Sequence, residues 1–208
     1  MKIRLFTIPN MLTLSNLLCG TFALVSALKY GNLEWSFWFV VLAAVFDFFD
    51  GFVARLLGQS SPIGLQLDSL ADVVSFGAVP AAVLYVMTTH SFAREETLLL
   101  YVFAFASFLL AAFSALRLAK FNIDETQHEE FCGLPTPANA LFFTSLGLIS
   151  ARTGFDFGGP VLICIMPLMA WLLVSPVRMF ALKFRGFGWR GNQVRYLFLL
   201  LAVVLIVV

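Results

Sequence analysis

The amino-acid sequence predicts an all-α fold, a polytopic bundle of transmembrane helices. Of its 208 residues, 61% are apolar and only 12% are charged, far from the composition of a soluble domain of this length. Apolar stretches recur along the chain between glycine, proline and clustered charges, and a membrane-spanning helix needs about 20 mainly apolar residues. No domain-length linker or internal repeat interrupts this pattern, so residues 1–208 are predicted to form one integral-membrane domain.

Seven spans are predicted, each bounded by such breaks. In order they are Met11–Leu28, Glu34–Leu57, Gly64–Thr88, Thr97–Lys120, Thr136–Ala151, Phe157–Val177 and Val194–Val208. The last is short for a span and is expected to be tilted, frayed or interfacial. Residues 1–10 are basic and lack a small-residue cleavage site. We therefore expect a juxtamembrane amphipathic helix ended by Pro9, and no removable signal peptide.

The distribution of basic residues predicts the orientation of the chain. With a cytoplasmic N-terminus, ten of the 13 Lys and Arg residues fall on the inner side of the membrane. The loops Leu57–Ile63, Phe121–Pro135 and Arg178–Arg195 are then cytoplasmic. We expect an integral protein of the cell (inner) membrane whose chemistry faces the cytoplasm.

Charge and cysteine content exclude two further classes of site. A net charge of +1 gives no basic surface for a nucleic acid partner. The three cysteines lie far apart, without a CxxC pair or neighbouring histidine to complete a zinc site.

Four aspartates in the second and third predicted spans are the informative feature. Each aspartate near the bilayer centre costs about 2.5–3.5 kcal/mol on insertion scales. Asp47 and Asp50 are three residues apart, and Asp68 and Asp72 are four apart, so each pair shares a helix face. The short loop between the spans makes them an antiparallel hairpin, in which the two faces can meet. Because Arg55 alone cannot neutralise four carboxylates, we expect bound cations.

The chemistry of the candidate ligands limits which metal ions the site can bind. An all-carboxylate set suits Mg²⁺, Mn²⁺ or Ca²⁺ rather than zinc, and two ions close together are plausible in such a set. Phosphate is the natural partner of carboxylate-held Mg²⁺. Gly51, Ala54 and Gly64 lie on the same helix faces and leave room for a bulky group. The alternative is that the aspartates cap helix ends or pair with arginine on a wetted surface.

At these positions the sequence resembles the CDP-alcohol phosphatidyltransferase family. The signature of that family is two aspartates, Gly, Ala-Arg, Gly and two further aspartates at set intervals. Every position is filled here, by Asp47, Asp50, Gly51, Ala54, Arg55, Gly64, Asp68 and Asp72.

The resemblance implies a six-helix core, usually a homodimer, that uses two divalent cations, Mg²⁺ or Mn²⁺, to join a CDP-linked lipid to an alcohol with release of CMP. It assigns metal binding to the four aspartates and the role of general base to Asp72. It places Gly51, Ala54, Arg55 and Gly64 at the CDP-lipid site, with Asn16 near the nucleotide. On the residues alone, Asn16 can equally bond a neighbouring helix.

A second segment, RLAKFNIDETQHEEFCGLPTPANA, resembles the phosphatidylserine synthase branch of the family. That likeness implies CDP-diacylglycerol and L-serine as substrates. Arg117 and Lys120 can hold a serine carboxylate or a lipid phosphate, and Asn122 is assigned to the same site, with Gly133, Pro135 and Pro137 shaping its wall. The alternatives are positive-inside snorkelling for the two cations and a stiff helix entry for the glycine and prolines.

Other functions remain open at this point. Within the family, the acceptor can be glycerol 3-phosphate or an inositol phosphate, although the single cation pair favours an acceptor with one carboxylate. Outside it, a cation transporter uses intramembrane aspartates along a path, whereas these four group on two adjoining helices. A non-catalytic scaffold that kept the signature by descent is the third alternative.

Overall fold

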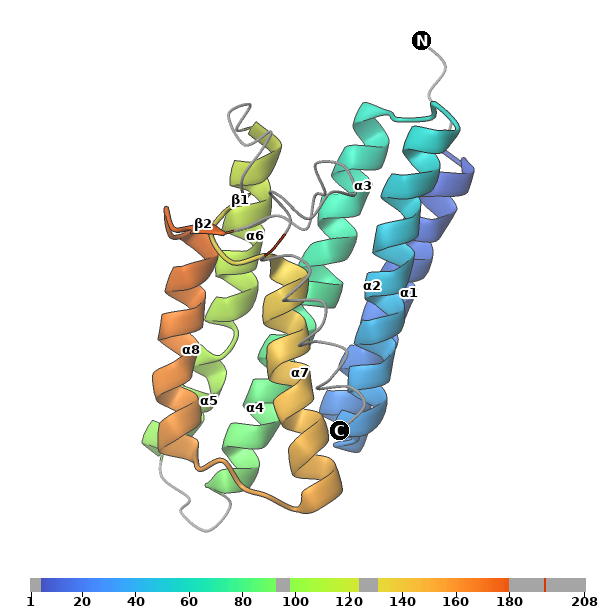
Figure 1. Ribbon diagram of the computed structural model, residues 1–208. Helices are drawn as coiled ribbons and strands as arrows, with labels where there is room; N and C mark the ends of the chain where they lie inside the picture. Colours follow the sequence, from blue (N-terminus) through green and yellow to red (C-terminus); the bar gives the residue numbers. More distant parts are fainter. Residues whose placement is uncertain (1–4, 93–97, 124–130, 180–192, 194–208) are drawn as a thin grey trace.

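Helices account for nearly all of the regular structure in the computed structural model, which describes residues 5–92, 98–123, 131–179 and 193. The helical elements are α1 (Ile8–Tyr30), α2 (Leu33–Leu56), α3 (Pro62–Asp72), the π-helix η1 (Val73–Ala78), α4 (Val79–Ser91), α5 (Leu98–Ala106), α6 (Leu109–Ile123), α7 (Thr136–Thr153) and α8 (Gly159–Val174). Figure 1 shows them side by side along one common direction, so the predicted all-α helical bundle is confirmed.

Four helical stretches are long and apolar enough to cross a membrane within the described residues. They are Ile8–Tyr30, Leu33–Leu56, Pro62–Ser91 and Tyr101–Ile123, and Gly159–Val174 is a shorter apolar helix. The predicted fifth span corresponds to α7, which is not among these candidates and whose buried face carries Thr136, Asn139 and Thr144. The predicted span Val194–Val208 lies outside the described residues.

The N-terminus corrects one prediction. Residues 5–7 are not helical, and residues 8–10 form the first turn of α1, with the Thr7 hydroxyl accepting a hydrogen bond from the Asn10 backbone amide at 3.4 Å. Pro9 therefore begins a helix and does not end one. Proline is favoured in the first helical turn, where its missing N–H has no intrahelical acceptor and its fixed φ suits the helix.

The stretch Pro62–Ser91 is the central element of the bundle. It is the most buried of the four long apolar stretches, and η1 interrupts it directly after Asp72, with the Val79 amide bonded to the Val74 carbonyl. Two close approaches fix η1. A Cβ on Gly20 of α1 would lie 2.9 Å from the Ser75 Cα, and one on Gly77 would lie 3.1 Å from the Ser114 Cβ of α6. Single-turn π segments occur frequently at functional sites.

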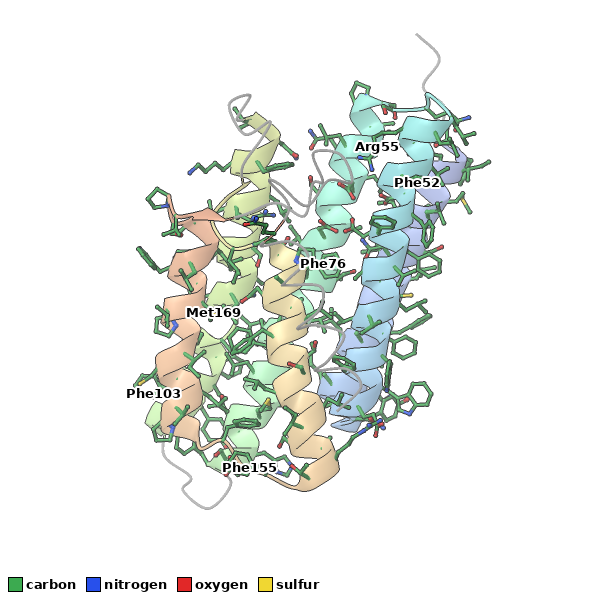
Figure 2. All side chains as sticks on the ribbon, viewed as in Figure 1. Phe52, Arg55, Phe76, Phe103, Phe155 and Met169 are labelled. Atoms are coloured by element: carbon green, nitrogen blue, oxygen red, sulfur yellow. The ribbon has the colours of Figure 1, made fainter. Side chains whose placement is uncertain are left out.

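The core lies between the helices along this central stretch. Its fully buried side chains include Val40, Phe76, Leu110 and Phe143 from four different helical elements. Figure 2 shows Phe76 inside the bundle, whereas Arg55 lies near one end of it, between α2 and α3. Phe48, Leu70 and other large apolar side chains on the outside are exposed, as expected for surfaces that face lipid.

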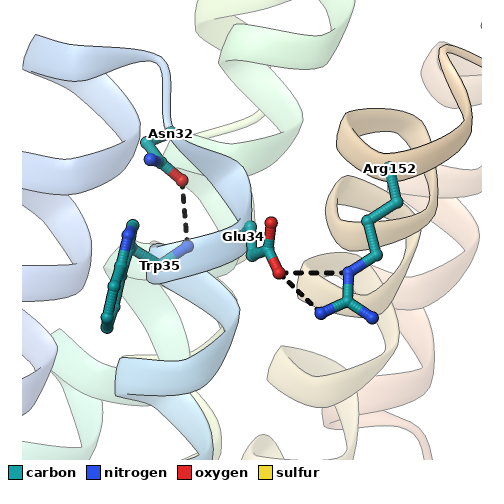
Figure 3. A network of polar contacts seen from close by, with 4 residues as sticks. All are labelled: Asn32, Glu34, Trp35 and Arg152. Carbon is teal, nitrogen blue, oxygen red and sulfur yellow. Dashed lines mark hydrogen bonds and ion pairs between the residues drawn. The ribbon is translucent and has the colours of Figure 1, made fainter.

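Polar contacts close the two ends of the bundle. At the end away from the aspartates, Arg152 of α7 forms an ion pair with Glu34 of α2 at 2.6 Å, and the Asn32 side chain caps α2 by accepting a hydrogen bond from the Trp35 amide at 3.0 Å (Figure 3). At the other end, the two-residue strands β1 (Phe131–Cys132) and β2 (Arg178–Met179) pair antiparallel. The ion pair and the strand pair join segments that are distant in the sequence, whereas the Asn32 cap is local.

Candidate active site

The four aspartates converge between the C-terminal half of α2 and the C-terminal half of α3. One carboxylate oxygen from each of Asp47, Asp50 and Asp68 lies within 4.8 Å of the other two. The Asp47 carboxyl group also lies close enough to that of Asp72 to interact with it electrostatically. Asp50 and Asp72 are buried, while Asp47 and Asp68 are half-buried. The predicted meeting of the two aspartate pairs is therefore confirmed in its geometry.

Helix α1 holds two of these aspartates in place. The Thr13 hydroxyl donates to the Asp50 Oδ2 at 2.6 Å, and the Asn16 Nδ2 donates to the Asp72 Oδ1 at 3.2 Å. The Ser75 hydroxyl in turn donates to the Asn16 backbone carbonyl at 3.1 Å. Asn16 is thus placed beside Asp72 rather than at the rim of the site. Thr13 was not predicted, although its spacing of three residues from Asn16 puts both on one face of an apolar helix.

The three-aspartate cluster fits a metal ion. Asp68 Oδ1 is buried without a hydrogen-bond partner among the described residues. Like charges at this separation repel strongly, particularly where water is excluded. An oxygen-only cluster of this kind can hold a divalent cation such as Mg²⁺ or Mn²⁺, which would neutralise the carboxylates and satisfy the buried Asp68 oxygen.

A pocket with a cavity volume of about 210 Å³ opens beside the cluster. Gly51, Ala54, Arg55 and Gly64 line it together with Asp50 and Asp68, so four of the five residues predicted for the CDP-lipid site share one cavity with two of the aspartates. The fifth, Asn16, is not among the residues that line the pocket. Pro9, Asn10 and Thr13 of α1 and the loop residues Gln59, Ser60 and Ser61 complete its wall. Arg55 forms no ion pair with any residue in the described ranges, which leaves its guanidinium available to an anion.

Arg117 approaches the aspartates from α6. Its side chain is 8% exposed, its Nη1 donates to the Thr136 hydroxyl of α7 at 3.4 Å, and its charge lies close enough to Asp72 to interact with it. A snorkelling arginine would extend to the membrane surface. Arg117 instead points into the protein, toward the aspartate cluster.

The other residues predicted for the acceptor site are more dispersed. The Asn122 Nδ2 donates to the Ser69 hydroxyl at 2.8 Å and links α6 to α3, whereas Lys120 is exposed. Gly133 is buried against α8 with φ +83°, and a Cβ there would lie 2.5 Å from the Leu173 carbonyl oxygen. Pro135 occupies the N-cap of α7. Lys120, Gly133 and Pro135 are therefore not brought together around Asp72, and their roles stay predictions.

Comparison with known proteins identifies the family. The profile of the CDP-alcohol phosphatidyltransferase family matches residues 6–208. The chain belongs to this family. Phosphatidyl transfer is accordingly the reaction class of this membrane enzyme, and the aspartate cluster is the part of it that can hold a metal.

Several bacterial and archaeal members of the CDP-alcohol phosphatidyltransferase family are similar to the chain over much of its length. A protein from Helicobacter pylori is 32% identical over 178 residues, covering 84% of this chain and 72% of the relative. One from Bacillus subtilis is 32% identical, covering 82% and 88%, and one from Methanocaldococcus jannaschii is 36% identical, covering 66% and 59%. All three relatives are named CDP-diacylglycerol–serine O-phosphatidyltransferase.

Proposed function

We propose that this enzyme transfers the phosphatidyl group of CDP-diacylglycerol to the hydroxyl of L-serine, giving phosphatidylserine and CMP. The observation that carries the proposal is the buried guanidinium of Arg117 beside Asp72, outside the set of residues that line the pocket with Arg55. An anionic donor and a carboxylate-bearing acceptor can thus bind at separate places beside the cluster. The names of the similar proteins support the same pair of substrates.

In this proposal Asp47, Asp50, Asp68 and Asp72 hold two divalent cations, Mg²⁺ or Mn²⁺. When bound, these ions neutralise negative charge on the pyrophosphate and on the departing CMP. The pocket lined by Gly51, Ala54, Arg55 and Gly64 receives the CDP part of the donor, and its three small residues give the nucleotide close access to the helix backbone. Asn16 acts by orienting Asp72 through their hydrogen bond.

The transfer step forms one P–O bond and breaks another. The serine hydroxyl oxygen attacks the phosphorus that carries diacylglycerol, and the bond from that phosphorus to the bridging oxygen breaks. The bridging oxygen leaves as part of CMP. Asp72 accepts the hydroxyl proton, Arg117 holds the serine carboxylate, and Asn122 supports the acceptor side by tying α6 to α3. Positioning and fixed charge supply most of the rate enhancement.

The arrangement also supports a topology and an assembly. The aspartates lie toward one end of the bundle rather than along a path across it, which disfavours a transporter. The excess of Lys and Arg on that side supports our proposal that the site faces the cytoplasm at the cell membrane. We propose a homodimer from the family resemblance. Cross-linking in native membranes tests it, and a purely monomeric species there would reject it.

The proposed reaction is tested by CMP release from the purified protein with CDP-diacylglycerol and Mn²⁺ or Mg²⁺. L-serine, glycerol 3-phosphate and inositol phosphate are offered separately. We expect release with serine alone, lost on chelation of the metal and in Asp50→Asn. Asp156→Asn, which changes an aspartate at the opposite end of the bundle, is the matched control and retains activity. Release with a different acceptor would reject serine, and no release with any acceptor would reject the proposal.

A further inference from the structure

Two buried polar side chains on α6 and α7 have no hydrogen-bond partner within the described part of the chain. Ser114 on α6 and Asn139 on α7 are both 0% exposed, and the unpartnered atoms are the Ser114 hydroxyl oxygen and both the Nδ2 and Oδ1 of Asn139. Leaving a buried donor or acceptor unpaired costs about 1–3 kcal/mol. A bound ligand or an internal water is needed to offset that cost.

The two side chains lie at the same depth in the bundle. Ser114 precedes Arg117 by three residues on α6, and Asn139 follows Thr136 by three on α7, so each pair shares a helix face. The two helices run in opposite directions (Figure 1), and the Arg117–Thr136 hydrogen bond joins them. At 1.5 Å per residue, Ser114 and Asn139 both lie about 4.5 Å deeper than that bond. We call these two residues the polar floor.

The register of α7 against the central stretch places the polar floor beneath Asp72. Helix α7 and the central stretch Pro62–Ser91 run in the same direction (Figure 1), and a Cβ on Gly147 of α7 would lie 2.8 Å from the Val83 side chain of the central stretch. Counting back eight residues on each brings Asn139 to about the level of Ser75, one turn beyond Asp72. Ser114 reaches the same region from the other side, where it packs against Gly77 of η1.

The polar floor and Arg117 complement the functional groups of an amino acid. Arg117 is buried without a carboxylate at ion-pair distance among the described residues, so it suits an anionic group. With the carboxylate on Arg117 and the hydroxyl at Asp72, the remaining group of serine is its α-ammonium. A buried ammonium has three donors and needs acceptors, which Asn139 Oδ1 and the Ser114 oxygen provide.

We propose that the polar floor receives the α-ammonium group of the acceptor and so selects an amino acid over acceptors without an amine. This inference rests on the proposed function and adds Asn139 and Ser114 to its substrate site. Glycerol 3-phosphate and inositol phosphate carry no ammonium group. They would leave Asn139 and Ser114 unpaired, and desolvated polar groups left unpaired by an analogue are a strong source of discrimination.

The test measures the KM for L-serine and the equilibrium binding of CDP-diacylglycerol in three variants. Asn139→Leu keeps the approximate shape of the side chain and removes both polar atoms, and Asn139→Asp keeps an acceptor at Oδ1. Ser36→Ala is the matched control, because Ser36 is also buried with an unpartnered hydroxyl but lies at the far end of α2. Donor binding reports whether each variant is folded.

We expect Asn139→Leu to raise the KM for serine about 10- to 100-fold, the effect of one hydrogen bond to a charged group. Asn139→Asp should stay close to the wild type, and Ser36→Ala should be unchanged. A serine KM that stays within twofold in Asn139→Leu assigns the polar floor to internal water and overturns the inference, as does an equal loss in Asn139→Asp. Absence of serine turnover in the wild type would instead reject the proposed function.

Discussion

Replacing Thr13 with valine removes a single hydrogen bond to the aspartate cluster and keeps the size of the side chain. The hydroxyl donates to Asp50 Oδ2 at 2.6 Å, and the two residues are only 3% and 6% exposed, so the bond is largely shielded from bulk water. A hydrogen bond to a charged group contributes about 1.5–3 kcal/mol. Each 1.4 kcal/mol is a tenfold change in a binding constant, so the concentration of Mn²⁺ that gives half-maximal activity should rise about 10- to 100-fold. This is the usual loss of metal affinity when a residue that hydrogen-bonds a metal ligand is replaced.

The assay is CMP release titrated with Mn²⁺ at saturating substrates. Thr13→Val should recover most of its activity at high metal, because every carboxylate is retained, and Thr13→Ser should titrate close to the wild type. Thr21→Val is the matched control, since Thr21 is on the same helix and its hydroxyl donates to the Leu18 carbonyl on an exposed face. If Thr13→Val titrates like the wild type, the Thr13–Asp50 bond does not position a metal ligand and the reasoning fails.

Three further changes test separate parts of the account. Asp72→Asn should lower turnover about 100- to 10,000-fold, the usual contribution of a general base, while Mn²⁺ binding persists. If the variant also loses Mn²⁺ binding, there is no evidence that Asp72 acts as a general base. Gly20→Ala places a Cβ 2.9 Å from the Ser75 Cα and should lower the free energy of unfolding by about 1–3 kcal/mol, measured by thermal unfolding. Gly51→Ala, where the nearest atom lies 3.9 Å from the added Cβ, should not lower it. Equal unfolding temperatures for the two variants would contradict the close approach of Gly20 to Ser75. Hydrogen bonds from the Ser91 hydroxyl and the Gly158 amide lower the pKa of Asp156 in the folded protein. The ionised carboxylate therefore stabilises the folded state fully at pH values above the pKa of an unfolded aspartate. This stabilisation is lost as the pH falls through the lowered pKa of the folded state. The unfolding temperature of Asp156→Asn should therefore lie below that of the wild type at pH 7, and the two should converge in acid; a constant difference would refute the role of the carboxylate.

The meeting of the four aspartates could be predicted because helical spacing is a local property. Residues three or four positions apart share a helix face whatever surrounds them. The loop between α2 and α3 is short, so α3 must run back antiparallel beside α2. The pocket residues follow from the same argument, since Gly51, Ala54 and Gly64 lie on those faces. Local periodicity therefore accounts for most of the candidate metal site.

The contribution of α1 and the π-helix could not be predicted in the same way. Whether Thr13 meets Asp50 depends on how α1 is rotated against α2, which is set by contacts between distant residues such as Gly20 and Ser75. The π-helix η1 accommodates an extra residue per turn, which rotates the side chains of α4 about the helix axis relative to those of α3. Nothing in the composition of Val73–Ala78 separates it from an ordinary apolar helix.

The fifth predicted span shows how far apolar stretches indicate membrane helices. Residues 136–151 were assigned as a span because breaks bound them, and they do form a helix. Its buried face is polar at Thr136, Asn139 and Thr144, and α7, although 18 residues long, is not among the four described stretches that are apolar enough to cross a membrane. Two of these polar residues, Thr136 and Asn139, are also the ones that the proposed acceptor site uses, whereas the Thr144 hydroxyl bonds carbonyls of its own helix.

The most direct test of the account follows the lipid-side phosphorus of CDP-diacylglycerol. Purified protein is given L-serine, Mn²⁺ and donor labelled with ³²P at that phosphorus, and the lipid and aqueous products are separated. The account predicts that the label appears in phosphatidylserine, that CMP is unlabelled, and that chelation of the metal or Asp50→Asn abolishes transfer. Label recovered in a nucleotide product, or transfer that survives removal of the metal, would contradict it.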